Sequence, residues 1–294
     1  MPTLVPIDDP ADPRVAPYVA MRERDVVGRG EGFIAEGEVV LRVLLGGGAR
    51  CRAASLLVAE NRLARIAALT RPLAPDIPVY VAGQAVMDSV VGFHIHRGLL
   101  AHGLRPADPG AATLLAGLPE RALVLALFGI ANHDNIGGVF RNAAAFGADA
   151  VLLDPGCCDP LYRKAIRVSV GATLKVPFAR LSSNDDAVSL LEAAGFACVA
   201  LSPAGTAPLA GLARPDRAAL LLGSEGAGLP DEVLARVRTV AITMAAGWDS
   251  LNVAAASAIA LHELTRGGLT TAISPARARR RTPPPPGSGR LPPA

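Results

Sequence analysis

Residues 122–147 have the sequence ALVLALFGIANHDNIGGVFRNAAAFG. The apolar run at its start predicts a buried strand at 123–130, and the segment after the glycine pair predicts a helix at 138–146 that ends at Gly147. The apolar run is about half as long as the ~20 residues that a membrane-spanning helix needs. The stretch therefore predicts a strand–loop–helix unit inside a globular domain.

The same alternation of strand and helix patterns continues to residue 264. Strands are predicted at 150–153, 174–178, 197–201, 218–222 and 240–244, and helices at 161–168, 187–194, 230–237 and 251–264. Apolar strands that alternate with helices form a parallel sheet covered on both faces. Ligands of such sheets bind at the carboxyl ends of the strands. The sequence therefore predicts an α/β domain with a ligand site at that edge.

A first motif, residues 135–141, bridges a loop and the start of a predicted helix. Its glycine pair permits close backbone approach, and a helix N-terminus attracts phosphate. Arg141 adds a planar guanidinium whose donors match phosphate oxygens. The alternative for Arg141 is a surface ion pair with Asp134 or Asp149.

Two further motifs follow predicted strands. Residues 223–229 have the sequence GSEGAGL, and three glycines in six residues indicate backbone contact with a bulky ligand. A tight turn in which Glu225 caps the next helix is the alternative. The loop lacks the Lys-Ser/Thr of a P-loop. The third motif joins residues 242–244 to residues 250–253, where a helix begins with Ser250 or Asp249 as its cap.

The three motifs, in this order, resemble the SpoU/TrmH family of RNA ribose 2′-O-methyltransferases over roughly residues 33–265. The resemblance implies an α/β fold of the SPOUT type with a trefoil knot, a homodimer, S-adenosyl-L-methionine as cofactor, and structured RNA (tRNA or rRNA) as substrate. Knots are rare in proteins, so only the resemblance predicts this one. A non-catalytic RNA-binding or ribosome-assembly protein with the same fold is the alternative function.

The resemblance also assigns roles to individual residues. The implied catalytic residues are Asn135, Arg141, Glu225, Ser250 and Asn252. The implied cofactor contacts are Leu201, Gly223, Ile242, Met244 and Leu251. Arg141 is assigned as a base in the family, but a guanidinium with a pKa above ~12 suits a phosphate anchor better. The sequence leaves both roles open.

Lys164 and Arg167 lie one turn apart on the predicted helix 161–168, so they are predicted to share a face. They are candidate contacts to the RNA backbone, with a solvated helix face as the alternative. Asn142 stands where many relatives have Thr, and Ala254 where many have Ser. Trp248, the single tryptophan, stacks on a base or ribose, or covers a dimer interface; the sequence does not choose.

Residues 33–102 predict a smaller α/β unit that resembles the substrate-binding domain of many SpoU enzymes. Its predicted elements are a helix around 34–44, strands at 55–59 and 77–82, and helices at 61–69 and 84–90. The remaining boundaries are an N-terminal arm at 1–32, a linker at 103–120, the methyltransferase domain at 121–268 and a disordered tail at 269–294.

The net charge of +3 is unevenly distributed. Residues 275–294 carry five arginines and no acidic residue, which leaves the rest of the chain at −2. RNA binding must therefore use a local patch or the tail. The tail is predicted to be either a solubilising segment or an auxiliary phosphate-binding arm.

Other classes of protein are disfavoured. The four cysteines form no Cys-x-x-Cys pair, and His94 and His96 lack a third ligand, so no metal is expected. The N-terminus lacks the cationic start and apolar core of a signal peptide, so a cytoplasmic protein is expected. A nucleotide-dependent oxidoreductase needs G-x-G-x-x-G after the first strand, and the loop after Ile130 lacks it.

Overall fold

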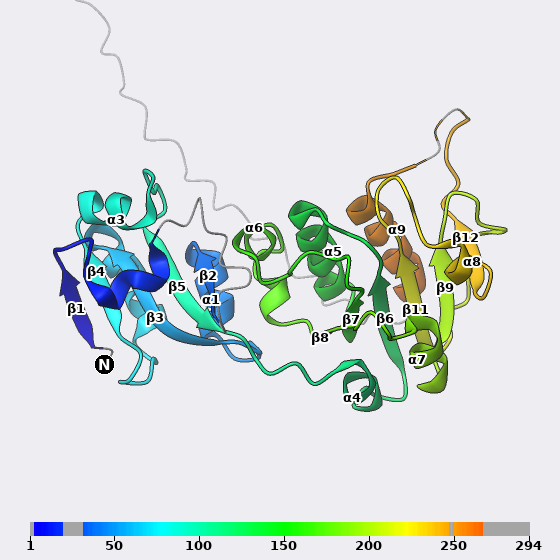
Figure 1. Ribbon diagram of the computed structural model, residues 1–294, viewed down its shortest axis with the longest axis horizontal. Coiled ribbons are helices and arrows are strands. Elements are labelled where there is room, and N and C mark those ends of the chain that lie inside the picture. The colour runs from blue at the N-terminus through cyan, green and yellow to red at the C-terminus, as the bar shows by residue number, and fades with distance from the viewer. Residues whose placement is uncertain (1–2, 20–31, 247, 249, 267–294) are drawn as a thin grey trace, which may run out of the picture.

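The computed structural model describes residues 3–19, 32–246, 248 and 250–266. These residues form two α/β units, each built on its own sheet, with α6 (Arg163–Val168) between the two sheets (Figure 1). Within the described ranges, no helix has the length and apolar character needed to cross a membrane. The predicted tail lies outside the described residues.

The C-terminal unit contains a seven-stranded sheet in which every pairing is parallel, in the order β10-β12-β9-β11-β6-β7-β8. Strand β6, which has a neighbour on each side, is buried along its whole length, because helices cover both faces of the sheet. The predicted parallel-sheet α/β fold is therefore confirmed. The strands are β6 (Ala122–Leu127), β7 (Ala150–Leu153), β8 (Phe178–Arg180), β9 (Ala197–Leu201), β10 (Ala207–Pro208), β11 (Arg217–Leu222) and β12 (Arg238–Ala241).

Two groups of helices cover this sheet. α5 (His133–Ala145) and α9 (Val253–Thr265) pack on one face. α4 (Ala111–Ala116), α7 (Ala187–Ala193) and α8 (Asp231–Leu234) pack on the other. Since α4 lies within the predicted linker 103–120, part of that linker belongs to the domain's own core.

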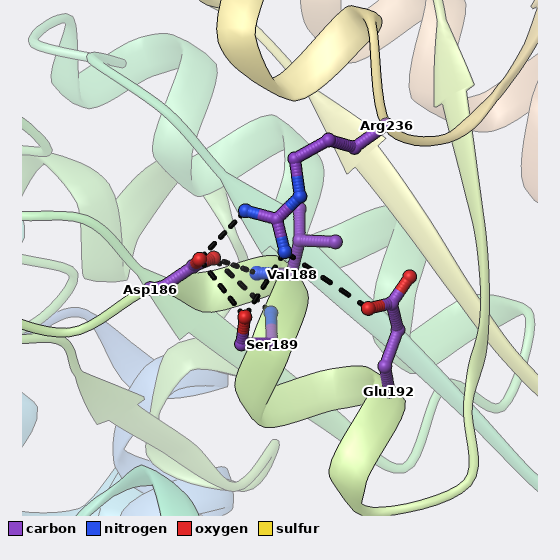
Figure 2. Close-up of polar contacts among 5 residues, drawn as sticks. All are labelled: Asp186, Val188, Ser189, Glu192 and Arg236. Carbon is purple, nitrogen blue, oxygen red and sulfur yellow. Dashed lines mark hydrogen bonds and ion pairs between the residues drawn. The ribbon is translucent and has the colours of Figure 1, made fainter.

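A network of polar contacts fixes the start of α7 (Figure 2). Asp186 accepts hydrogen bonds from the backbone N–H groups of Val188 and Ser189, at 3.0 and 3.1 Å, as an N-cap does. Arg236 donates to Asp186 Oδ2 at 2.6 Å and to Ser189 Oγ at 3.0 Å, and it pairs with Glu192 at 3.9 Å. The hydrogen bond from Arg236 is the main reason why the pKa of Asp186 is lowered to about 2.

α5 begins at His133, earlier than the predicted residue 138, so the glycine pair lies inside the helix. A Cβ on Gly137 would lie 2.8 Å from Val168 Cβ on α6, and a Cβ on Gly138 would lie 2.7 Å from Ala254 Cβ on α9. The two glycines therefore let α6 and α9 approach α5. The structure gives them this packing role in place of the loop contact to phosphate that the sequence suggested.

Two other predicted elements are placed differently. The predicted strand 174–178 is a 3-10 turn, η3 (Ala172–Leu174), followed by β8, which begins at Phe178. β12 ends at Ala241, so residues 242–244, which were predicted as the end of this strand, form a loop after it.

The N-terminal unit contains a five-stranded sheet in the order β1-β4-β3-β5-β2. The predicted helix around 34–44 is present from residue 38 on as α1 (Glu38–Leu45), but its predicted start belongs to strand β2 (Gly32–Glu36). The strands are β1 (Leu4–Ile7), β2 (Gly32–Glu36), β3 (Arg52–Ala59), β4 (Val79–Ala82) and β5 (Leu99–Leu104). The helices are α1 (Glu38–Leu45), α2 (Leu63–Thr70) and α3 (Gln84–Val91), with 3-10 turns η1 (Pro13–Tyr18) and η2 (Glu60–Arg62).

Residues 3–19 belong to this N-terminal unit. β1 pairs in parallel with β4, and Tyr18 is fully buried with its hydroxyl 2.8 Å from Ser55 Oγ. The prediction of an arm separate from the N-terminal unit is wrong for these residues. Residues 20–31 of the predicted arm lie outside the described ranges.

α6 joins the two units. Leu161 and Ile166 share one buried cluster with Leu41 of α1. Beside that cluster, Arg163 Nη1 donates to the buried Glu36 Oε2 at 2.7 Å. Packing and an ion pair therefore hold the N-terminal unit against the domain that carries the predicted motifs.

Candidate active site

The loops after β9, β11 and β12 end at one edge of the sheet and, with the start of α9, enclose a pocket of about 710 Å³. This volume falls within the range of about 300–1,000 Å³ that small-molecule sites occupy. All five predicted cofactor contacts line the pocket: Leu201, Gly223, Ile242, Met244 and Leu251. Three of the five predicted catalytic residues do so too: Glu225, Ser250 and Asn252.

Residues that the sequence did not single out also line the pocket. They include Ser202, Pro203 and Ala204 after β9, Asp231 and Leu234 of α8, and Ala256 of α9. Residues 202–204 carried a usable signal, because they directly follow a predicted strand at the ligand edge of the sheet. The α8 and α9 residues carried none, since only the tertiary fold brings them there.

The glycine loop after β11 closes on itself. Ser224 and Gly228 exchange backbone hydrogen bonds of 3.2 and 3.1 Å, and Gly226 has a φ of 97° that other residues rarely adopt. A Cβ on Gly223 would lie 2.1 Å from the carbonyl carbon of Gly228. Gly223 is therefore required by the loop's own backbone, before any ligand contact is considered.

Asn252 connects three parts of the site. Its Oδ1 accepts from the backbone N–H groups of Ala254 and Ala255, at 2.9 and 3.3 Å, so it is the N-cap of α9. Its Nδ2 donates to Asn135 Oδ1 at 2.9 Å and to Glu225 Oε1 at 2.8 Å. Because the helix N–H groups fix which side-chain atom is the oxygen, the amide nitrogen must face Asn135 and Glu225.

These contacts correct two predictions. The cap of α9 is Asn252 and not the predicted Ser250 or Asp249. The alternative in which Glu225 caps α8 is also wrong, because Pro230 occupies that N-cap position without a side-chain hydrogen bond. Glu225 instead accepts from Asn252, which places its carboxylate at the pocket.

Arg141 lies outside the pocket lining, on the exposed side of α5. Within the described part of the chain, its guanidinium makes no hydrogen bond or ion pair. The two carboxylates proposed as surface partners are engaged elsewhere: Asp134 pairs with Lys164 at 2.6 Å, and Asp149 accepts from Leu123 N at 2.7 Å. The ion-pair alternative for Arg141 is therefore wrong.

The next residue, Asn142, ties α5 to α9. Its Nδ2 donates to Ala254 O at 2.7 Å and to Ser257 Oγ at 2.9 Å. The helix carrying Asn135 and Arg141 is therefore fixed against the helix that Asn252 caps. Asn142, at a position where many relatives have Thr, therefore has a structural role between two helices.

The two predicted RNA contacts on α6 face different partners. Lys164 pairs with Asp134 of α5, while Arg167 Nη1 lies 4.0 Å from Glu36 of β2. Their side chains remain 46% and 42% exposed, so both can still contact a ligand. Neither lines the pocket.

The pocket fits a cofactor that combines an apolar ring with a cationic centre. Leu201, Ile242, Met244 and Leu251 supply apolar side chains, and the loop at 223–228 presents backbone. Glu225 and Asp231 add carboxylates. S-adenosylmethionine has a purine, a sulfonium and an amino-acid group, which match these features. No group of His, Cys, Asp and Glu side chains among the described residues is arranged to hold a metal ion.

Comparisons with known proteins identify relatives of the chain as a whole. The SpoU rRNA Methylase family matches residues 122–262. A relative from Mycobacterium tuberculosis, named an uncharacterised tRNA/rRNA methyltransferase, is 39% identical over 274 residues, which cover 88% of this chain and 91% of the relative.

Two solved structures are similar over nearly the whole chain. An AdoMet-bound rRNA methyltransferase from Sinorhizobium meliloti has a TM-score of 0.75 and 25% identity, with 91% of this chain and 99% of that chain covered. An RNA 2′-O ribose methyltransferase has a TM-score of 0.69 and 25% identity, with 90% and 98% covered. These similarities show that the chain belongs to the SpoU rRNA methylase family.

Proposed function

We propose that this chain transfers a methyl group from S-adenosylmethionine to a ribose 2′-hydroxyl of tRNA or rRNA. The observation that carries the proposal is the hydrogen-bonded set of Asn252, Asn135 and Glu225, which links the pocket to α5. Family membership supports methyl transfer to RNA. The similarity to a structure named an RNA 2′-O ribose methyltransferase supports the ribose hydroxyl as acceptor.

The pocket is the proposed cofactor site, held by Leu201, Gly223, Ile242, Met244 and Leu251. When bound, S-adenosylmethionine supplies an electrophilic methyl group on a sulfonium sulfur. The pocket's apolar side chains offer a surface for the purine, and the capped start of α9 fixes the loop that carries Ser250 and Leu251. Positioning of this kind supplies about 7–11 kcal/mol in well-oriented reactions. The AdoMet-bound relative from Sinorhizobium meliloti supports this assignment.

Asn135 and Arg141 are the proposed contacts to the RNA. Asn252 already donates to the Asn135 oxygen, so Asn135 is left to offer its Nδ2–H groups to a substrate oxygen. Arg141 keeps its proton and binds the phosphate next to the reacting ribose, because a guanidinium is a poor proton acceptor. The hydroxyl proton then leaves to that phosphate or to water. Lys164 and Arg167 contribute further contacts to the backbone.

A homodimer, the trefoil knot and a cytoplasmic location are further parts of the proposal. Exposed apolar residues support the dimer: Ala255 and Ile259, the latter 41% exposed, lie four residues apart on α9, and Leu251, just before the helix, is 43% exposed. Trp248, 76% exposed, adds to this surface or stacks on the substrate. Sedimentation of the purified chain tests the dimer, since a monomer at all concentrations contradicts it.

The function is tested by mapping 2′-O-methyl positions in total RNA from cells with and without the protein. We expect at least one position to lose its methyl group without the chain and to regain it in vitro when purified chain and S-adenosylmethionine are added. If the chain binds RNA but neither binds S-adenosylmethionine in calorimetry nor changes any position, the alternative of a non-catalytic RNA-binding or ribosome-assembly protein replaces this proposal.

A further inference from the structure

A second cavity lies away from the pocket, where the N-terminal unit meets α6. It has a volume of about 430 Å³. We call it the junction cleft and define it by four arginines that line it: Arg62, Arg65, Arg97 and Arg167. The first three belong to the N-terminal unit, and Arg167 belongs to α6 of the C-terminal unit. A ligand that fills the cleft therefore contacts both units.

Two carboxylates in the cleft are each shared by two arginines. Glu38 accepts from Arg42 at 2.6 Å and from Arg65 at 2.5 Å. Glu36 pairs in the same way with Arg163 at 2.7 Å and Arg167 at 4.0 Å. Arg42 and Arg163 do not line the cleft, so its lining has four arginines against two carboxylates, a net charge of +2. The cleft is thus cationic in a chain that, without residues 275–294, has a net charge of −2.

Arg62 and Arg97 are the cations least committed to the fold. Arg62 Nη2 makes one long hydrogen bond, 3.4 Å, to the backbone oxygen of His96. Arg97 forms no ion pair or hydrogen bond with any described residue, and its guanidinium lies over Gly37, where a Cβ would come within 3.2 Å of Nη1. Gly37 also has a φ of 94°, so a side chain there would be strained as well as crowded. Glycine at this position therefore leaves room for the Arg97 guanidinium inside the cleft.

We propose that the junction cleft binds backbone phosphates of the RNA substrate, as a second anchoring site apart from the pocket. Guanidinium groups match phosphate oxygens, and partner carboxylates pre-orient Arg65 and Arg167 for that contact. Cations on both units, three arginines on the N-terminal unit and Arg167 on α6, fit a polymer with repeated phosphates better than a single small anion. Without residues 275–294 the chain has a net charge of −2, so RNA binding needs a local group of cations, and the cleft supplies one. The proposal rests on the proposed function for the identity of its ligand.

The test compares RNA binding by wild type, an Arg62→Gln/Arg97→Gln double variant and Arg71→Gln as a function of salt concentration. Arg71 is a matched control because it lies at the other end of α2, is exposed and does not line the cleft. Each phosphate contact contributes about 0.7–0.9 to the log–log salt slope. We expect the double variant to lose about 1.4–1.8 in slope, and to bind RNA roughly ten-fold or more weakly at physiological salt. Arg71→Gln should match wild type.

Methylation and S-adenosylmethionine binding are measured on the same preparations. We expect the double variant to raise KM for RNA while kcat and cofactor affinity stay at wild-type values. Arg62→Lys/Arg97→Lys should restore most of the slope, since a lysine still neutralises a phosphate. This rescue separates a charge effect from a loss of fold.

Three results overturn the proposal. The first is a salt slope of the double variant equal to that of Arg71→Gln, and the second is a KM for RNA of the double variant equal to that of a wild type that methylates. The third is complete competition of RNA binding by millimolar inorganic phosphate. The last result indicates a small-anion site. A wild type that binds RNA but never methylates it overturns the proposed function alone, because the slope comparison still decides the role of the cleft.

Discussion

Replacing Asn252 with alanine removes four hydrogen bonds at once. Its Oδ1 loses the cap contacts to the N–H groups of Ala254 and Ala255. Its Nδ2 loses the contacts to Asn135 and Glu225. Loss of an N-cap costs about 1 kcal/mol, and each of the other two bonds contributes about 0.5–1.5 kcal/mol, at the lower end because the site is exposed. We expect Asn252→Ala to lower the free energy of unfolding by about 2 kcal/mol.

Asn252→Ser separates the two roles of this side chain. A serine oxygen accepts from the helix N–H groups, so the cap of α9 is kept, but it cannot bridge Asn135 and Glu225 as the amide does. We expect the serine variant to be about 1 kcal/mol more stable than the alanine variant. Both variants should lose methyl transfer to a similar degree, about 10- to 100-fold, because displacing a reacting group by about 1 Å has an effect of this size.

The assay pairs chemical denaturation with single-turnover methyl transfer at saturating RNA and cofactor. Full transfer by Asn252→Ser would refute the idea that the amide positions Asn135 and Glu225. Equal stability of the two variants would refute the capping argument. Calorimetry with S-adenosylmethionine is the control. A large loss of cofactor affinity would attribute the lost methyl transfer to weaker cofactor binding and not to displaced Asn135 and Glu225.

Three further predictions concern Arg141, the tail and the α7 cap. Arg141→Ala should abolish transfer but leave S-adenosylmethionine affinity within a few-fold in calorimetry, because Arg141 lies outside the pocket lining; retained turnover on the full RNA would contradict this. Deleting residues 275–294, with their five arginines, should reduce the salt slope of RNA binding by up to about 0.7–0.9 per contact and keep turnover at saturating RNA, and an unchanged slope would exclude the tail. Asp186→Ala should lower the free energy of unfolding by about 1 kcal/mol at pH 7. The pKa of Asp186 is lowered to about 2, so the wild-type advantage exists above its unfolded pKa and declines as pH falls from about 4 to about 2. An equal difference at both ends of that range in denaturation titrations would argue against the Arg236 contact.

The sequence predicted the sheet of the C-terminal unit well because its strands are short apolar runs between turns. β7 and β9 have the predicted bounds. The prediction misplaced β8, since Leu174 and Val176 are buried without being in a strand. β1 was missed because its pairing with β4 depends on a partner more than 70 residues away along the chain, and local patterns do not encode it.

The candidate site was predictable to the extent that it lies at strand ends. Leu201, Gly223 and Ile242 lie at or next to the ends of β9, β11 and β12, and all three line the pocket. The hydrogen bonds of Asn252 were not predictable, because its partners are 27 and 117 residues away in sequence. The junction cleft was missed for the same reason, since its arginines come from separate segments of two units.

The glycines of the motifs show why a match in sequence does not by itself identify a ligand contact. Gly137 and Gly138 are required by the packing of α6 and α9 on α5, and Gly223 by the backbone of Gly228. A bulky substitution at Gly223 therefore distorts the loop itself, and a loss of cofactor binding in such a variant cannot be attributed to a removed contact. Asn252→Ser changes the polar network while keeping the helix cap. Only a substitution of that kind separates the chemistry of this site from the packing that positions it.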